Sequence, residues 1–235
     1  MLYILAFPTL PNINCWAFLY HLSKLIDQNS IWINFPVQDA FNPNSGLLEL
    51  KAMQKLRVKT VKNGQIIELG AVKYKDGQII DKYESLVYAK DIPKFIQEVT
   101  NITPKMLEDA PLIETVLEEF KLFLEDDVFI AHNIKFDYQF VSDSFKKYDL
   151  GKLQNRNLCT IDLAKRTIDA KRYGLDFMKE LLNIDIDNQH RAYSDALSTS
   201  YIFKESLSKL GNEISTVEEL INFSKSDNLI NKNKN

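Results

Sequence analysis

The spacing of hydrophobic residues changes near residue 93, from alternation to the period of a helix. Before that point, an Asn-Gly pair at residues 63–64 and an Asp-Gly pair at residues 76–77 flank a mainly apolar run. Such pairs beside alternating runs are strong signals of β-hairpins. The pattern therefore predicts a strand over residues 65–74 and an antiparallel partner over residues 78–88.

Beyond that change, the pattern predicts helices separated by short buried strands. Apolar residues recur three and four positions apart, which is the spacing of one face of an amphipathic helix. Strands followed by alternating helices and strands are typical of an α/β domain with a mixed sheet. The predicted helices cover residues 104–107, 112–124, 136–147, 161–169, 174–182 and 192–210, and the predicted strands between them cover residues 128–131 and 157–160.

Three segments of the chain differ in composition. Residues 1–57 are rich in aromatic side chains and poor in charge, and they predict a small N-terminal appendage with a helix over residues 16–26. Residues 58–210 form the α/β domain, and residues 56–61, which alternate, are a candidate for its first strand. Residues 211–235 are a polar tail with one short helix, which begins at a Thr-x-x-Glu capping box.

The composition allows a folded domain and restricts its partners. The chain has 235 residues, of which 45% are hydrophobic and 11% aromatic, so it can bury a substantial core. The formal net charge is −3, so there is no wide basic surface for tight, non-specific binding of duplex nucleic acid. An acidic protein can still handle nucleic acid where bound cations supply the positive charge.

The cysteines and the apolar runs bear on location. Cys15 and Cys159 match no metal-binding spacing, and they predict free thiols in a reducing cytoplasm. The opening residues 1–7 are apolar but short and are followed by a proline, so we expect folded structure there rather than a signal peptide. No apolar run reaches the roughly 18–20 residues that a membrane helix needs, so we expect no membrane partner.

The first candidate chemical group is the carboxylate of Asp137. The apolar run at residues 128–131 predicts a buried strand, and an amphipathic helix begins at Phe136. Such a strand end places Asp137 at the carboxyl edge of a sheet, where α/β folds have their chemistry. The alternative interpretation is an acidic residue in the first turn of a helix that only interacts with the helix dipole.

His190 and Asp195 are a second pair of candidates, at the start of the last long helix. Five helical steps turn about 500°, so the two side chains would point about 140° apart if both residues were helical. They converge more easily if His190 lies in the preceding loop. A loop histidine can act as a general base while the carboxylate holds a metal ion. The alternative is a helix-capping region with a surface histidine.

Several segments of the chain match the motifs of one family, in the family's order. These segments are Ile66–Val72, Thr100–Leu107, Ala131–Asp137, Tyr173–Asp176 and His190–Ala196. With them, the region from about residue 64 to about residue 210 resembles the DEDDh class of 3′–5′ exonucleases. That class includes the epsilon proofreading subunit of bacterial replicative DNA polymerase, RNase T and oligoribonuclease.

The resemblance implies a fold, a cofactor and roles for the candidates. The fold would be RNase H-like, with a mixed central sheet flanked by helices. Two Mg²⁺ or Mn²⁺ ions would bind, with Asp137 and Asp195 as metal ligands and His190 as the catalytic base that deprotonates the attacking water. The substrate would be the 3′ end of single-stranded DNA, or RNA, since family members take either. The catalytic subunit of a DNA polymerase is the implied protein partner.

The chain departs from the family pattern at the first acidic motif. Family members have Asp-x-Glu there, which supplies two of the four carboxylates around the ions. No Asp-x-Glu occurs in this sequence, and residues 55–62 carry lysine and arginine instead. Two carboxylates cannot easily hold two divalent ions, and Glu68 is the nearest substitute. The alternative function is therefore a catalytically impaired module that binds nucleic acid or a polymerase.

Overall fold

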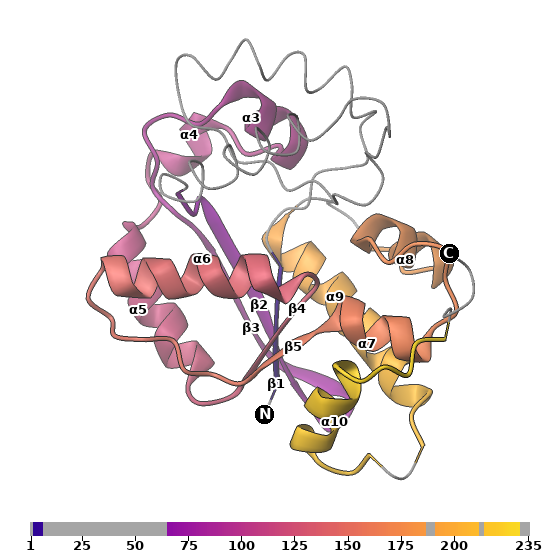
Figure 1. Ribbon diagram of the computed structural model, residues 1–235. Coiled ribbons are helices and arrows are strands. Elements are labelled where there is room, and N and C mark those ends of the chain that lie inside the picture. Colours follow the sequence, from indigo (N-terminus) through magenta and orange to yellow (C-terminus); the bar gives the residue numbers. More distant parts are fainter. Residues whose placement is uncertain (1, 7–64, 187–190, 212–213, 231–235) are drawn as a thin grey trace, which may run out of the picture.

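A mixed β-sheet forms the centre of the protein (Figure 1). The structure is a computed structural model that describes residues 2–6, 65–186, 191–211 and 214–230. Its sheet has the strand order β3-β2-β1-β4-β5, with β1 antiparallel to β2 and parallel to β4. The predicted mixed sheet is confirmed. The strands are β1 (Leu2–Ala6), β2 (Glu68–Lys75), β3 (Gln78–Leu86), β4 (Val128–Ala131) and β5 (Asn157–Cys159).

The β2–β3 hairpin turns at Asp76 and Gly77, as the sequence predicts. These residues have positive φ angles of 50° and 82°, which is the backbone conformation that makes Asp-Gly favourable in two-residue hairpin turns. β2 is buried along nearly its whole length because strands lie on both sides of it and helices cover both faces. β3 is the outer strand, and its first residues are exposed.

The central strand β1 comes from the opening residues of the sequence. Its pairing with β2 and β4 confirms that this apolar run is folded, but it places Leu2–Ala6 in the sheet rather than in an N-terminal appendage. An all-apolar run suits this position because the strand is enclosed between two others. The candidate strand at residues 56–61 and the predicted helix at residues 16–26 lie outside the described residues. The boundary at residue 57 therefore stays a prediction.

The described helices follow the predicted order. The ends that were predicted differ by at most two residues from those observed, which is the usual uncertainty of helix boundaries. The helices are α3 (Lys94–Thr100), α4 (Pro104–Leu107), α5 (Ile113–Leu124), α6 (Ile134–Lys147), α7 (Thr160–Thr167), α8 (Leu175–Leu181), α9 (Ala192–Ser208) and α10 (Val217–Ser224).

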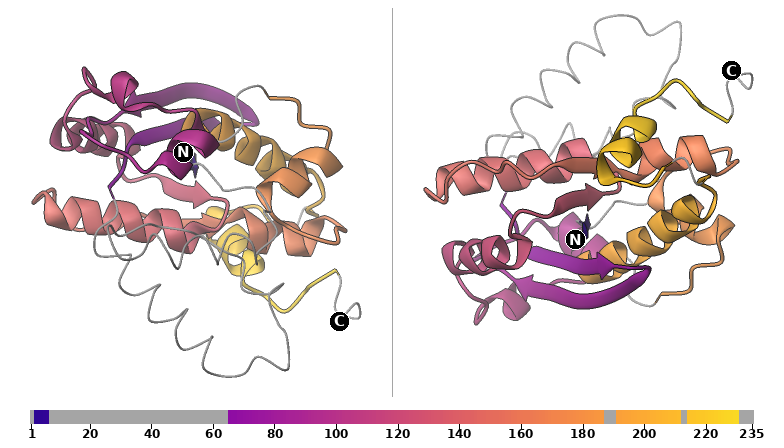
Figure 2. Two further views of the ribbon diagram at one scale, coloured as in Figure 1. Left: turned by 90° about the horizontal axis from the view of Figure 1, so that it is seen from above. Right: turned by 90° about the horizontal axis from the view of Figure 1, so that it is seen from below.

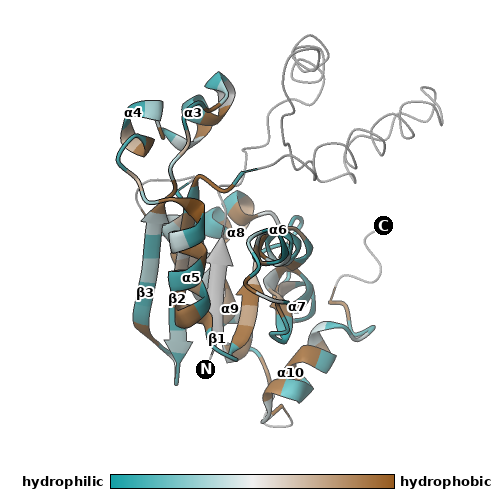
Figure 3. Cartoon of the chain, turned by 90° about the vertical axis from the view of Figure 1, so that its left-hand side faces the viewer, coloured by the Kyte–Doolittle hydropathy of each residue, from teal (hydrophilic) through white to brown (hydrophobic). Residues whose placement is uncertain are grey.

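Helices cover both faces of the sheet, as the two turned views in Figure 2 show. Leu69 and Phe129 pack on one face with α5 and α6, whereas Val72 and Ile130 pack on the other with α7, α9 and α10. Successive strand residues point to opposite faces, so each strand contributes to two apolar layers. Figure 3 shows both hydrophobic and hydrophilic residues on α5, as expected for a helix with one buried side.

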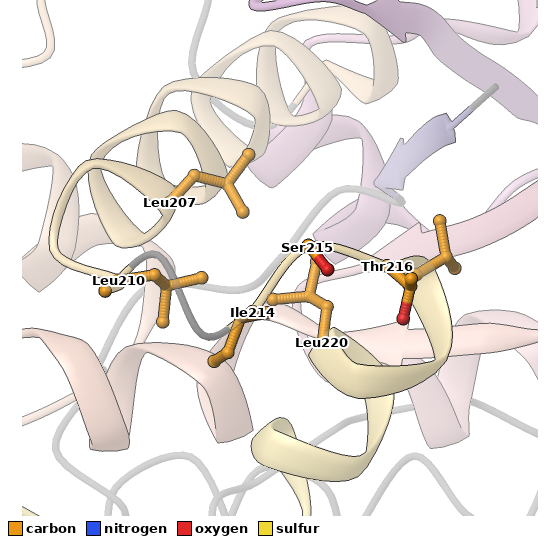
Figure 4. Close-up of a pocket in the computed structure, with 8 residues that line it drawn as sticks. Leu207, Leu210, Ile214, Ser215, Thr216 and Leu220 are labelled. Atoms are coloured by element: carbon orange, nitrogen blue, oxygen red, sulfur yellow. The ribbon is translucent and has the colours of Figure 1, made fainter.

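A hollow lies between the end of α9 and the start of α10 (Figure 4). It is lined mainly by apolar side chains, among them Leu207, Leu210, Ile214 and Leu220. Leu207 is twelve residues beyond Asp195 on the same helix, which corresponds to about 18 Å along its axis. The hollow is therefore separate from Asp195. None of the helices in the described ranges is long and apolar enough to cross a membrane.

Candidate active site

Asp137 lies directly beyond the end of β4, where the strand-turn-helix pattern predicted it. β4 ends at Ala131, and Asn133 turns the chain with a φ of 78°, a conformation that asparagine tolerates better than most residues. Helix α6 then begins at Ile134, so Asp137 is in its first turn and is 4% exposed. A carboxylate at this position interacts favourably with the helix dipole.

Asp195 lies in the first turn of α9 and is 2% exposed. The start of α9 packs directly on β2 at Gly70, where a β-carbon would lie 2.3 Å from the backbone nitrogen of Tyr193. Gly70 pairs with Ala6, the last residue of β1. The first turn of α9 is therefore held over the end of β1.

Strand register brings the two carboxylates to one edge of the sheet. β1 and β4 are parallel neighbours, and Leu5 pairs with Ala131. The helix that follows β4 and the helix that packs on the end of β1 thus begin at the same edge. Asp137 and Asp195 both lie there, and the strand-turn-helix pattern had predicted this edge for Asp137. The third predicted site residue, His190, lies outside the described residues.

Glu68, the substitute ligand considered from the sequence, is engaged in holding α9. Its side chain is 1% exposed. The Nε atom of Arg191 donates to Glu68 Oε1 at 2.7 Å, and the backbone nitrogen of Ala192 donates to Oε2 at 2.9 Å. Arg191 Nη2 lies 2.6 Å from Oε1 as well. Both carboxylate oxygens are thus hydrogen-bonded, so Glu68 positions the first turn of α9 and is poorly suited to bind a metal ion.

Replacing Glu68 by alanine should destabilise the protein by about 2 kcal/mol, because the change leaves a half-buried arginine and a buried backbone N–H without their acceptor. Glu68→Gln should cost less, since its amide oxygen can still accept from Ala192. Urea unfolding of both variants measures this. Glu84→Ala removes an exposed acid from the neighbouring strand and should change stability by less than about 0.5 kcal/mol. Equal losses at the two positions would contradict the role of Glu68.

His132 is a buried residue of the site edge whose role the sequence did not reveal. Its Nε2 atom lies 2.7 Å from the carbonyl oxygen of Tyr173, and its Nδ1 atom lies 2.8 Å from the hydroxyl of Thr160. A carbonyl only accepts, so Nε2 carries the proton and Thr160 donates to Nδ1. Burial lowers the pKa of His132 to about 4. The side chain is therefore neutral and ties β4 to α7 and to the segment before α8.

The described residues do not fit the family's two-ion site. β1, the strand between β2 and β4, has no acidic residue, and Glu68 is already hydrogen-bonded to the start of α9. In the described ranges, no three histidine, cysteine or acidic side chains form a group that could hold a metal ion. Asp137 and Asp195 match the family's acidic motifs and provide two of the four expected carboxylates. Asp162, in the first turn of α7 just beyond β5, also lies at this edge but matches none of those motifs.

Comparison with known proteins supports the fold and the family. Residues 53–203 match the family model described as Exonuclease. A PolC-type DNA polymerase III of Staphylococcus haemolyticus is 42% identical over 142 residues, which are 59% of this chain and 10% of that protein. This chain thus spans about a tenth of the length of that relative.

Solved structures show the same fold. Exonuclease X in complex with 5′-overhanging duplex DNA has a TM-score of 0.54 at 23% identity, and the match covers 68% of this chain and 92% of that one. Pop2p of S. pombe, in a form with bound Mg²⁺ and Mn²⁺, has a TM-score of 0.54 at 17% identity, with 83% and 90% covered. These neighbours confirm the predicted RNase H-like exonuclease fold.

Proposed function

This chain belongs to the exonuclease family, and on that premise we propose that it binds the 3′ end of a single strand of nucleic acid and hydrolyses nucleotides from it. One observation carries the proposal. Asp137 and Asp195, the two acidic residues that match the family motifs, are buried in the first turns of two helices that begin at one edge of the sheet.

The proposed roles of the residues follow the family resemblance. Asp137 and Asp195 are the acidic residues at the reacting phosphate, and a divalent ion, Mg²⁺ or Mn²⁺, is the proposed cofactor. His190 is the proposed base. In the reaction His190 takes a proton from water and the oxygen of that water bonds to phosphorus. The bond to the 3′ oxygen of the preceding nucleotide breaks, that oxygen takes up a proton, and the terminal nucleotide is released as a nucleoside monophosphate. Because only two of the family's four motif carboxylates have counterparts among the described residues, we expect slow hydrolysis.

A second candidate function is a module that binds a 3′ end without cleaving it. The absence of acidic residues from β1 favours this candidate, because β1 lies between β2 and β4 at the edge where Asp137 and Asp195 are found. Such a module would keep the strand-binding surface of the fold and lack the reaction. The two candidates differ in hydrolysis and agree on binding, so both properties have to be measured.

A labelled strand distinguishes the two candidates. We expect a 5′-labelled single strand to shorten from its 3′ end in the presence of Mn²⁺, and Asp195→Asn to slow this by at least about 100-fold, because the residue would lose its charge at the reacting phosphate. Asp143→Asn, a change at an exposed position on α6, is the control and should leave the rate unchanged. Binding without shortening would favour the second candidate, and an absence of both would contradict each of them.

Partner and location belong to the same proposal. The PolC-type relatives are polymerases, which supports a proofreading role beside the catalytic subunit of a DNA polymerase. DNA is the proposed substrate, and a parallel assay with an RNA strand tests that choice, because only contacts to the sugar separate the two. The cytoplasmic location expected from the cysteines stays a prediction.

A further inference from the structure

The loop between α7 and α8, residues 168–174, lies beside the candidate active site. His132 is the residue that follows β4, and its Nε2 atom donates to the carbonyl oxygen of Tyr173 in this loop at 2.7 Å. The same strand end leads into the first turn of α6, which contains Asp137. The α7–α8 loop therefore borders the edge of the sheet at which we propose that the 3′ end binds.

The base of this loop is fixed by packing and hydrogen bonds. Ile168 and Ala170 are 7% and 8% exposed and pack in an apolar cluster with residues of α8 and α9. The hydroxyl of Tyr173 donates to the carbonyl oxygen of Ile168 at 2.9 Å and closes the loop on itself. Figure 1 shows α7 and α8, the helices that the loop joins, beside α9. Residues between these anchors are held in place.

Two cations project from the fixed loop into solvent. Lys171 and Arg172 are exposed, and neither forms an ion pair within the part of the chain that the structure describes. Lys135, in the first turn of α6, is also exposed. The loop also contains Asp169, so its net charge is only +1. Attraction of a polyanion to this loop must therefore depend on the positions of the two cations rather than on the net charge of the loop.

The positions of these cations match what a strand end would need. A phosphodiester backbone that approaches Asp137 and Asp195 meets buried carboxylates, and the whole chain has a net charge of −3. Repulsion of this kind is offset by cations at the rim of the site, where they contact phosphates that do not react. Lys171 and Arg172 are suited to this because ordering them costs little beyond the entropy of their own side chains.

We propose that Lys171 and Arg172 form a contact site for the sugar-phosphate backbone of the single strand whose 3′ end lies at Asp137 and Asp195. The inference rests on the proposed function and extends it with a binding surface. Contacts to phosphates do not read bases, so the site should take strands of any sequence. Each phosphate contact to a single strand contributes about 0.7 to the slope of log affinity against log salt.

Fluorescence anisotropy with a labelled strand of about 12 deoxythymidines, in EDTA to prevent hydrolysis, tests the proposal with the full chain. The double variant Lys171→Ala/Arg172→Ala should weaken binding about tenfold, and the salt slope should fall by about 1.4. The control is Lys146→Ala/Lys152→Ala, which removes the same charge from exposed positions at the far end of α6 and just beyond it. The control should change affinity by less than about twofold.

The outcomes separate this inference from the proposed function. Equal weakening in the two double variants would show a general charge effect and would overturn the loop site, as would full affinity in the loop variant. In both of those cases the wild-type chain still binds, so the proposed function stands. If the wild-type chain binds no single strand, the proposed function and the loop site fail together. Urea unfolding midpoints equal to that of the wild type show that the variants are folded.

Discussion

Replacing Gly70 by alanine is expected to destabilise the protein by about 3 kcal/mol. A β-carbon at this position would lie 2.3 Å from the backbone nitrogen of Tyr193 and 2.5 Å from the carbonyl carbon of Ala192. Both are backbone atoms of the first turn of α9, which cannot rotate away as a flexible side chain would. The helix must therefore move, and Asp195 moves with it. Urea unfolding, with a lower midpoint at an unchanged slope, measures the loss.

Gly174 provides the matched control for this prediction. A β-carbon added at Gly174 would have no neighbouring atom within 4 Å, and the φ of −70° at this residue is open to other residues. Serine is a favoured residue at this position, since Gly174 is the N-cap of α8. Gly174→Ser should therefore be neutral or slightly stabilising. If Gly70→Ala were equally neutral, that result would contradict the contact between Gly70 and the first turn of α9.

Lowering the pH from 7 to 4 is expected to remove roughly 3 kcal/mol of stability through His132 alone. Burial lowers the pKa of this histidine from 6.5 to about 4 in the folded protein. Between these two values the unfolded chain binds a proton that the folded protein does not. The contribution is therefore fully present above pH 6.5 and is lost as the pH falls toward 4. The measurement is the free energy of unfolding in urea at several pH values.

His132→Gln isolates this effect from the carboxylates that titrate in the same range. Glutamine can still donate to the carbonyl of Tyr173 and accept from Thr160, but it does not titrate. The variant should be less stable than the wild type at pH 7 and should lose less stability on acidification. Parallel profiles for the two proteins would mean that His132 is accessible to protons in the folded state, contrary to its burial.

Local features were predictable because neighbouring residues determine them. The Asp76-Gly77 turn, the change from β4 to α6 before Asp137 and the capping box at Thr216 were all confirmed, and the last has both of its reciprocal hydrogen bonds. In each case the conformation depends on residues a few positions apart. The sequence therefore sufficed to place Asp137 and Asp195 in the first turns of their helices.

Features that depend on distant residues were not predictable in this way. Glu68 accepts hydrogen bonds from Arg191 and Ala192, which are 123 and 124 positions further along the chain. No local sequence pattern predicts such a pairing. His132 looked like one residue of a motif, whereas its neutral state follows from Thr160 and Tyr173. The place of β1 at the centre of the sheet was missed for the same reason, because an apolar run does not specify its partners.

The central position of β1 has a consequence for how the protein folds. The hairpin of β2 and β3 closes across a two-residue turn, whereas β1 must close a loop of roughly 60 residues to reach β2 and an even longer one to reach β4. Without β1, the pair β3-β2 and the pair β4-β5 share no strand contact. We therefore expect the pairing of β1 with its two neighbours, a non-local step, to limit the rate of folding.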